Sequence, residues 1–288
     1  RNFMKKFCFL HLFTSLFYFN TSSLDAMTGF QNRSVVPFGQ TITAQSLDSL
    51  VVSGIRYIQS HGEPFEARAG NGLQAYDVTY TLLDSRNRLH QMRAPRSIQY
   101  FCRELLAYFN GSLRVNQGLF QASKSWGALA DEHGNINSNY GYYVFHQKMK
   151  KFQEKTQYEW VIKNLIKNID SRKAFINVNQ PIHKDLKTKD FPCTIGMQFF
   201  VSQDTLCNTI SSRSTDVFTG LPYDMGFFSV LTELVYAHLR EKLPLDKARK
   251  LQLGHTTMKT NFTQIYDKTK KQAIDLVDGL DACHSTSL

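Results

Sequence analysis

Apolar residues recur three and four positions apart along several stretches of the chain, which is the spacing of one helical face. Glycine or proline follows the first two of these stretches, at Gly62, Pro64 and Gly111, and both residues commonly end helices. In the second stretch the predicted buried face includes Leu106 and Phe109. The predicted helices cover residues 46–60, 98–109, 157–169, 225–239 and 263–280.

β-Branched and aromatic residues concentrate in other stretches and predict strands over residues 73–83, 174–178 and 195–212. Within the last stretch, Gln203-Asp204 separates two apolar runs, which indicates a hairpin. Neither a repeat nor a linker interrupts this order of elements. The pattern predicts one α+β domain in which helices cover a mixed sheet.

The composition supports a folded chain with an anionic partner. With 288 residues, 42% of them hydrophobic, the chain is long enough to bury a sizeable core, which excludes disorder as its main state. The net charge of +10 favours phosphate-bearing partners but does not choose between a nucleotide, a nucleic acid and a membrane surface. The cysteines are odd in number, widely spaced and without a C-x-x-C pair, so we expect neither a disulfide framework nor a metal site: Cys8, Cys102, Cys193, Cys207 and Cys283.

The densest chemistry lies around one of these thiols. Cys193 follows Pro192, and Arg213 comes twenty residues later on the next strand of the predicted hairpin. A neighbouring cation favours the thiolate, which is the nucleophilic form of cysteine. The alternative is that Cys193 is a small buried hydrophobic residue.

The segments around Cys193 carry a recognisable pattern. Pro192-Cys193, the strand Gln198-Phe199-Phe200-Val201 and the segment Arg213-Ser214-x-Asp216-Val217-Phe218-x-Gly220-Leu221-Pro222 resemble the core of the thymidylate synthase superfamily, with unchanged spacing. The resemblance covers about residues 46–239. Four upstream elements also match: Arg68 to Gly72 resembles the phosphate loop, Glu104-Leu105-Leu106 the Glu-Leu-Leu helix, Trp126 to Gly141 the Trp-to-Tyr-Gly stretch, and Asp170-Ser171-Arg172-Lys173 the Asp-Ser-Arg-Arg element.

The resemblance implies three catalytic residues and a thymidylate synthase-like fold. Cys193 would add to carbon 6 of a pyrimidine nucleotide, which makes carbon 5 nucleophilic towards a one-carbon unit. Glu104 would order water and proton transfers at the base, and Tyr140 would assist proton removal from carbon 5.

The resemblance also implies a phosphate site shared between subunits. Arg68, Arg213 and Ser214 would hold the 5′-phosphate of a pyrimidine nucleoside monophosphate. Arg172 and Lys173 would reach it from the other subunit of a homodimer formed through the sheet face, with Lys173 in place of a family Arg.

Asp224 is the main departure from the pattern, because thymidylate synthases carry Asn there. An acid can accept from the exocyclic amine of cytosine and, when protonated, donate to its bare ring nitrogen, whereas it matches uracil poorly. Thr194 replaces a family His after the nucleophile, which supports the same shift. At this position the chain resembles the deoxycytidylate hydroxymethylases. Asp224 could also cap a helix beginning at Met225.

The co-substrate implied by the resemblance is 5,10-methylenetetrahydrofolate, with Trp126, Asp216 and Gly220 at its site; Asp216 borders the nucleotide as well. His255 is the residue nearest in pattern to the family's sugar-binding pair, which leaves ribose and deoxyribose both open. The polar ending Ala282 to Leu288 favours access of water, and hence a hydroxymethyl rather than a methyl product.

These observations favour a folate-dependent dCMP or CMP hydroxymethylase. The alternatives are methyl transfer to dUMP or dCMP, and an inactive relative that only binds a nucleotide or nucleic acid. The retained Cys193, Glu104, Tyr140 and Arg213 speak against the inactive relative. A cysteine protease fits least, because no His or Asn element accompanies the thiol in a recognisable pattern.

The first residues have the layout of a secretory signal, with Met4-Lys5-Lys6 before an apolar stretch, yet they are too short to span a membrane. The alternative is upstream sequence before a start at Met27. We therefore treat residues 1–26 as a signal-like or non-native extension and residues 27–288 as the catalytic domain. Because both substrates are cytosolic metabolites, we expect a cytoplasmic protein without membrane contact.

Overall fold

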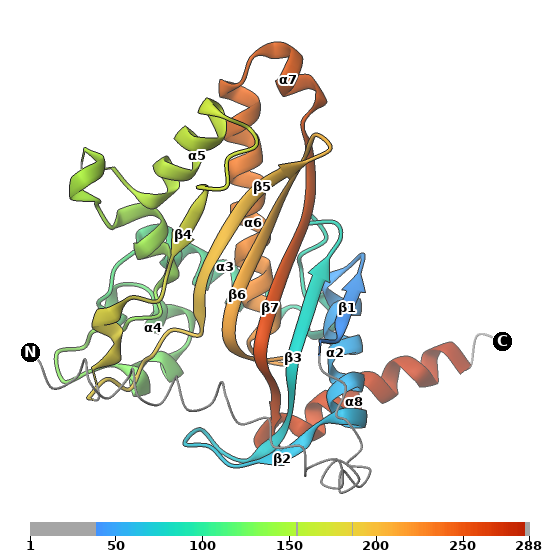
Figure 1. Cartoon of the computed structure of the whole chain (residues 1–288). Coiled ribbons are helices and arrows are strands. Elements are labelled where there is room, and N and C mark those ends of the chain that lie inside the picture. Colours follow the sequence, from blue (N-terminus) through green and yellow to red (C-terminus); the bar gives the residue numbers. More distant parts are fainter. Residues whose placement is uncertain (1–38, 154, 186, 286–288) are drawn as a thin grey trace, which may run out of the picture. The chain divides into compact units, whose positions relative to one another are not determined.

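The computed structural model describes residues 39–285 except 154 and 186, and no side chains from residue 281 onward. Its centre is a mixed sheet in the order β1-β3-β7-β6-β5-β4, with β2 paired to β3 (Figure 1). The predicted N-terminal extension lies outside the described residues. The strands are β1 Thr41–Ala44, β2 Glu63–Phe65, β3 Gly72–Leu82, β4 Phe175–Asn177, β5 Thr194–Ser202, β6 Thr205–Asp216 and β7 Gln252–Tyr266.

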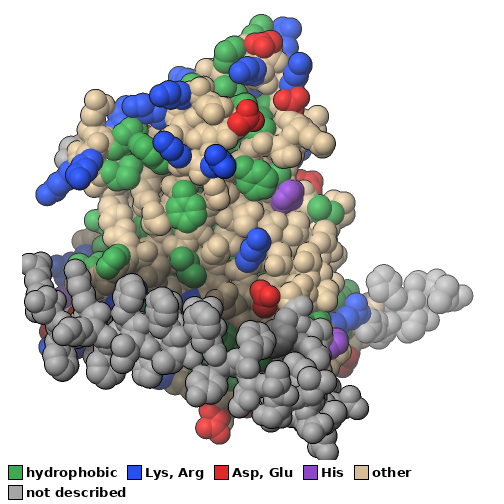
Figure 2. Space-filling view, viewed as in Figure 1, with side chains coloured by type: hydrophobic (Ala, Val, Ile, Leu, Met, Phe, Trp, Pro, Cys, Tyr) green, Lys and Arg blue, Asp and Glu red, His purple; other side chains and the backbone are tan. Residues whose placement is uncertain are grey.

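Helices pack on one face of this sheet, with α6 behind its central strands in Figure 1. This arrangement confirms the predicted α+β fold with a mixed sheet covered by helices. Figure 2 shows the other face, where apolar side chains lie among polar ones. The helices are α2 Leu47–His61, α3 Arg96–Asn110, α4 Leu119–Ala122, α5 Gln157–Lys167, α6 Leu221–Lys242, α7 Leu245–Lys250 and α8 Asp267–Ser285, with short 3₁₀ and π turns between them.

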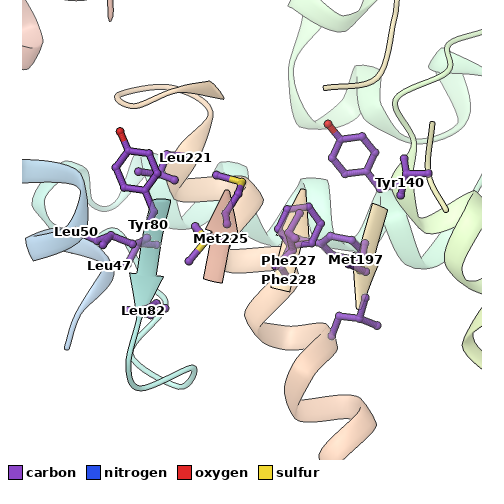
Figure 3. Close-up of a cluster of buried hydrophobic side chains, with 14 of the residues drawn as sticks. Leu47, Leu50, Tyr80, Leu82, Tyr140, Met197, Leu221, Met225, Phe227 and Phe228 are labelled. Atoms are coloured by element: carbon purple, nitrogen blue, oxygen red, sulfur yellow. The ribbon is translucent and has the colours of Figure 1, made fainter. Parts of the chain in front are cut away.

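The main core lies between α6 and the sheet. Met225, Phe227 and Phe228 project from α6 towards side chains of β3 and β5 (Figure 3). Tyr140 borders the same cluster, and its hydroxyl points away from it in that view. The apolar face predicted for residues 225–239 is confirmed, since Phe228, Leu231, Val235 and Leu239 are all fully buried.

The hairpin predicted at Gln203-Asp204 is also confirmed. Both turn residues have positive φ, 49° and 57°, which suits the tight turns that match the twist of two antiparallel strands. Thr205 pairs with Ser202 across this turn, and the pairing continues to Thr194 opposite Ser212. The hairpin therefore brings the start of β5 beside the end of β6.

The prediction for residues 263–280 was wrong at its start. Strand β7 runs to Tyr266, and α8 begins only at Asp267. This strand escaped detection because it buries threonines whose hydroxyls hydrogen-bond inside the core. The Thr263 hydroxyl lies 2.8 Å from the Tyr80 hydroxyl, and the Thr260 hydroxyl donates to the Val78 carbonyl at 2.8 Å.

The buried face of α3 also differs from the prediction. Leu106 and Phe109 are 68% and 40% exposed, whereas Glu104 and Tyr108 are buried. The helix is rotated so that a carboxyl and a phenol face inward. A search for regularly spaced apolar residues does not detect a buried face that carries polar side chains.

Leu231→Ala should lower the free energy of unfolding by about 2–5 kcal/mol, because it leaves a cavity between α6 and the sheet. Leu106→Ala makes the same chemical change at an exposed position and should cost about 0.5 kcal/mol or less. Urea denaturation measures both variants. Equal losses would contradict the observed orientation of α3.

Candidate active site

A cavity of about 410 Å³ lies where the start of β5, the end of β6 and the first turn of α6 meet α3. Its wall contains ten of the predicted site residues: Arg68, Glu104, Trp126, Tyr140, Cys193, Arg213, Ser214, Asp216, Gly220 and Asp224. Residues that lie far apart in the sequence thus converge on one pocket.

Cys193 and Arg213 are held together by backbone pairing. The Arg213 amide donates to the Cys193 carbonyl at 2.9 Å, and the Cys193 sulfur lies 3.6 Å from the Ser214 hydroxyl. Burial raises the pKa of Cys193 above its usual value, and the charge of Arg213 offsets only part of this rise. The charge of Arg213 thus favours the thiolate, as expected from the sequence, but desolvation of the buried sulfur outweighs this effect.

The Arg213 guanidinium also fixes the segment that carries the thiol. Its Nε donates to the Pro192 carbonyl at 3.2 Å and its Nη2 to the Phe191 carbonyl at 2.7 Å, while Nη1 donates to the Ser214 hydroxyl at 3.1 Å. Guanidinium has five N–H groups, so these bonds leave one on each terminal nitrogen. Two parallel donors suit an oxyanion such as phosphate.

Two more cations border the cavity. Arg68 donates to the Lys189 carbonyl at 2.6 Å, and both side chains line the pocket with Arg213. Sequence reasoning missed Lys189, which stands four positions before Cys193. Arg172 and Lys173 are exposed and do not line this cavity. Their predicted contribution across a dimer interface stays a prediction.

Two acids lie close together in the lining of the same cavity. Glu104 from α3 is 4% exposed, and burial raises its pKa to about 8, with the Asp224 charge acting in the same direction. Burial raises the pKa of Asp224 on α6 to about 7. Helix α6 begins at Leu221, so Asp224 lies within its first turn and is not the helix cap considered from the sequence.

Tyr140 stacks between aromatic rings, with centroids 5.6 Å from Tyr108 and 6.2 Å from Phe228. Burial raises its pKa well above the usual value, so the phenol stays neutral near pH 7. A neutral hydroxyl can relay a proton through hydrogen bonds but does not act as a phenolate base.

Asp190 anchors the segment that carries Cys193. Its carboxylate accepts from the Asn137 and Ser138 amides at 2.7 Å each and from the Ser138 hydroxyl at 2.5 Å. These bonds tie the segment before Cys193 to the segment before Tyr140. Sequence reasoning did not assign this role to Asp190.

The prediction that His255 belongs to the sugar-binding part of the site was wrong. His255 does not line the cavity; its Nδ1 lies 3.4 Å from the Cys207 sulfur, and its ring contacts Phe200. Strand β7 runs parallel to β6, so His255 sits near the hairpin turn, while Gln264 and Tyr266 at the other end of β7 reach the cavity.

A second cavity, of about 840 Å³, adjoins the first and shares Tyr100, Trp126 and Tyr223 with it. Arg93 and Arg96 lie in its wall. Between residues 39 and 285, outside the two gaps, no cluster of three or more His, Cys, Asp or Glu could hold a metal ion, and no helix is long and apolar enough to cross a membrane.

Glu104→Gln should stabilise the protein increasingly as the pH rises. A folded-state pKa of about 8 against an unfolded value of 4.5 means that the folded chain retains a proton the unfolded chain releases, so wild-type stability falls between these pH values. The difference should grow by up to roughly 1.4 kcal/mol per pH unit. Thermal unfolding at pH 5 and pH 8 measures it, with exposed Glu132→Gln as the control. A difference independent of pH would contradict the buried, proton-holding Glu104.

Comparison with known proteins agrees with this geometry. Residues 52–276, most of the chain, match the thymidylate synthase family. The thymidylate synthase of Vesicomyosocius okutanii subsp. Calyptogena okutanii (strain HA) is 27% identical over 135 residues, which are 46% of this chain and 50% of the relative. The chain thus spans about half the length of that relative. With its sheet, thiol, cations and acids arranged around one cavity, the chain belongs to the thymidylate synthase family.

Proposed function

We propose that the protein transfers a one-carbon unit to carbon 5 of a cytosine nucleotide, dCMP or CMP, and releases a hydroxymethyl product. The observation that carries this proposal is Asp224, an acid whose pKa burial raises to about 7, in the same cavity as Cys193. In its protonated form such an acid donates to the bare ring nitrogen of cytosine while its other oxygen accepts from the exocyclic amine.

The nucleotide would lie with its phosphate on the cations and its base between the thiol and the acids. Arg213 offers two N–H groups, and Arg68 and Lys189 add charge at the same wall. The Cys193 sulfur adds to carbon 6, and the electron pair of the carbon 5–carbon 6 bond becomes available at carbon 5. Asp224, hydrogen-bonded at the ring nitrogen, stabilises the charge that develops in the ring.

The second substrate would be 5,10-methylenetetrahydrofolate, which supplies the one-carbon unit. The cavities fit such a group at Asp216, whose Oδ1 accepts from the amides of Phe218 and Thr219, while its buried Oδ2 has no hydrogen-bond partner among the described residues. An unpaired buried acceptor is suited to an N–H donor of a ligand. Trp126 provides an aromatic face at the junction of the two cavities.

Proton transfers fall to Glu104 and Tyr140. The carbon 5 proton leaves once the one-carbon unit is attached, and the Tyr140 hydroxyl and Glu104 carboxyl relay it away from the base. Departure of the carbon 5 proton would expel the tetrahydrofolate nitrogen from the one-carbon unit and leave a methylene group on carbon 5. Water would add to this methylene, and the electron pair returned to the ring would expel the Cys193 sulfur from carbon 6. This restores the ring double bond and gives the hydroxymethyl group.

We infer a homodimer in which the exposed sheet face is the interface. Phe199 of β5 is buried in the core, so its neighbour Phe200 faces the opposite side of the sheet. Arg172 and Lys173 are exposed in the single chain. Side chains that reach the cavity of a partner subunit would have to be exposed in this way. Figure 2 shows this face with apolar groups accessible.

A second candidate is methyl transfer to dUMP, which the name of the thymidylate synthase relative favours. It differs in two respects: the base bears an N3–H where cytosine has a bare nitrogen, and the folate is oxidised to dihydrofolate. Accumulation of dihydrofolate during turnover separates the two reactions.

Cys193→Ala should abolish tritium release from carbon 5 of labelled dCMP, because no other described thiol lines the cavity. Exposed Cys102→Ala on α3 is the matched control and should release tritium at the wild-type rate. Unchanged release from the Cys193 variant would refute its role as the nucleophile.

Asp224→Asn should shift preference from dCMP towards dUMP. In the orientation that pairs with uracil, the amide faces a donor with its donor and an acceptor with its acceptor on cytosine. This mismatch corresponds to roughly a 10- to 100-fold change in the ratio of kcat/KM values. Steady-state kinetics with both nucleotides measures this ratio. A variant that still prefers dCMP would refute the proposed base recognition.

The pH dependence of binding provides a control for this variant. Wild-type affinity for dCMP should weaken as the pH rises above about 7, because Asp224 loses the proton that it donates. Affinity of the Asn variant for dUMP should lack this dependence on Asp224. Calorimetric titrations between pH 6 and 8, about one unit to either side of the Asp224 pKa, compare the two.

A further inference from the structure

Tyr100 stands at the junction of the two cavities and was absent from the predicted site. It lines both pockets, and its ring centroid lies 4.4 Å from that of Tyr223 on α6. On α3 it precedes Glu104 by four residues, so the two side chains share one helical face. Tyr100 therefore separates the proposed nucleotide side from the proposed folate side.

The Tyr100 hydroxyl connects Trp126 to the Glu104 carboxyl through two hydrogen bonds. The Trp126 indole Nε1–H donates to the Tyr100 hydroxyl oxygen at 3.1 Å, and that hydroxyl donates to Glu104 Oε1 at 2.7 Å. An indole nitrogen can only donate. The hydroxyl oxygen is thus an acceptor for Trp126, and its hydrogen is directed to Glu104.

We propose that Tyr100 is a positioning residue that, held by Trp126, determines which oxygen of Glu104 carries the transferable proton. Because Oε1 accepts from Tyr100, a proton on this carboxyl belongs on Oε2. A proton on Oε1 would force the Tyr100 hydrogen away from its acceptor inside a partly buried site, which is unfavourable. The inference rests on the proposed function, in which Glu104 moves protons near the base.

The titratable groups that face Glu104 lie on α3 and α6. They determine whether the pKa of Glu104 rises or falls when the Tyr100 hydroxyl is removed. Tyr100 and Tyr108 on α3 donate hydrogen bonds that favour the ionised carboxylate. Asp224 on α6 opposes ionisation through its charge, and the nearby Tyr223 hydroxyl is neutral. Removing the Tyr100 hydroxyl therefore removes a stabilising bond from the carboxylate and raises the pKa of Glu104.

The same chain of bonds connects the folate side to the proton-transfer group. A co-substrate packed on Trp126 touches the donor that holds the Tyr100 hydroxyl in place. Occupancy of the second cavity would thereby stabilise the orientation of the Glu104 proton. This would favour proton transfer once both substrates are bound.

Tyr100→Phe tests the proposal, because it keeps the ring and removes the hydroxyl. Carboxyl-labelled glutamate gives a carbon NMR signal for Glu104, identified by its loss in Glu104→Gln. The titration midpoint should lie near pH 8 in the wild type and rise by about one unit in Tyr100→Phe. Trp126→Phe should shift it in the same direction but less. Tyr223→Phe, whose hydroxyl makes no recorded bond to Glu104, should leave the midpoint unmoved.

A midpoint in Tyr100→Phe equal to that of the wild type would overturn the proposal, as would an equal shift in Tyr223→Phe. Tritium release from dCMP across the same pH range gives the second readout. The pH at which the rate of release changes should shift together with the NMR midpoint. A shifted midpoint without tritium release in any protein would support the role of Tyr100 and refute the proposed function. Tritium release whose pH dependence is the same in Tyr100→Phe as in the wild type would overturn the role of Tyr100 alone.

Discussion

The antiparallel pairing of β5 with β6 is the constraint on which the candidate site depends. A two-residue turn at Gln203-Asp204 sets the register, and the pairing ends with the Arg213 amide on the Cys193 carbonyl. A slip of one residue would reverse the faces of a strand and separate the thiol from the guanidinium. Cys193 is therefore held by the backbone of the sheet and by Arg213 bonds to the preceding carbonyls.

Burial determines the chemistry of the two acids in the cavity. Glu104 and Asp224 come from different helices and meet beside aromatic rings that exclude water, so the pKa of each is raised towards neutral pH. Such acids can hold or release a proton under physiological conditions, which a solvated carboxyl does not do. The same burial destabilises their ionised forms. The site thus combines reactivity with a cost in stability at high pH.

Much of this arrangement could be predicted where local pattern and tertiary structure agree. The apolar spacing over residues 225–239 predicted α6, and the polar pair Gln203-Asp204 predicted the hairpin of β5 and β6. Strand β7 was missed because its buried positions are threonines, and the inward face of α3 was missed because it carries Glu104 and Tyr108. His255 was misplaced because a position along the chain does not reveal which end of a strand reaches the cavity. The spacing of Tyr100 and Glu104, four residues apart on a predicted helix, was a signal that could have found Tyr100.

The central claim is that Cys193 and Asp224 act on one cytosine ring and that water completes the product. Turnover of dCMP with 5,10-methylenetetrahydrofolate in heavy-oxygen water, followed by mass spectrometry of the nucleotide, tests it most directly. The account predicts a hydroxymethyl nucleotide that contains the heavy oxygen, with no dihydrofolate. A methyl product accompanied by dihydrofolate, or conversion of dUMP in preference to dCMP, would contradict it.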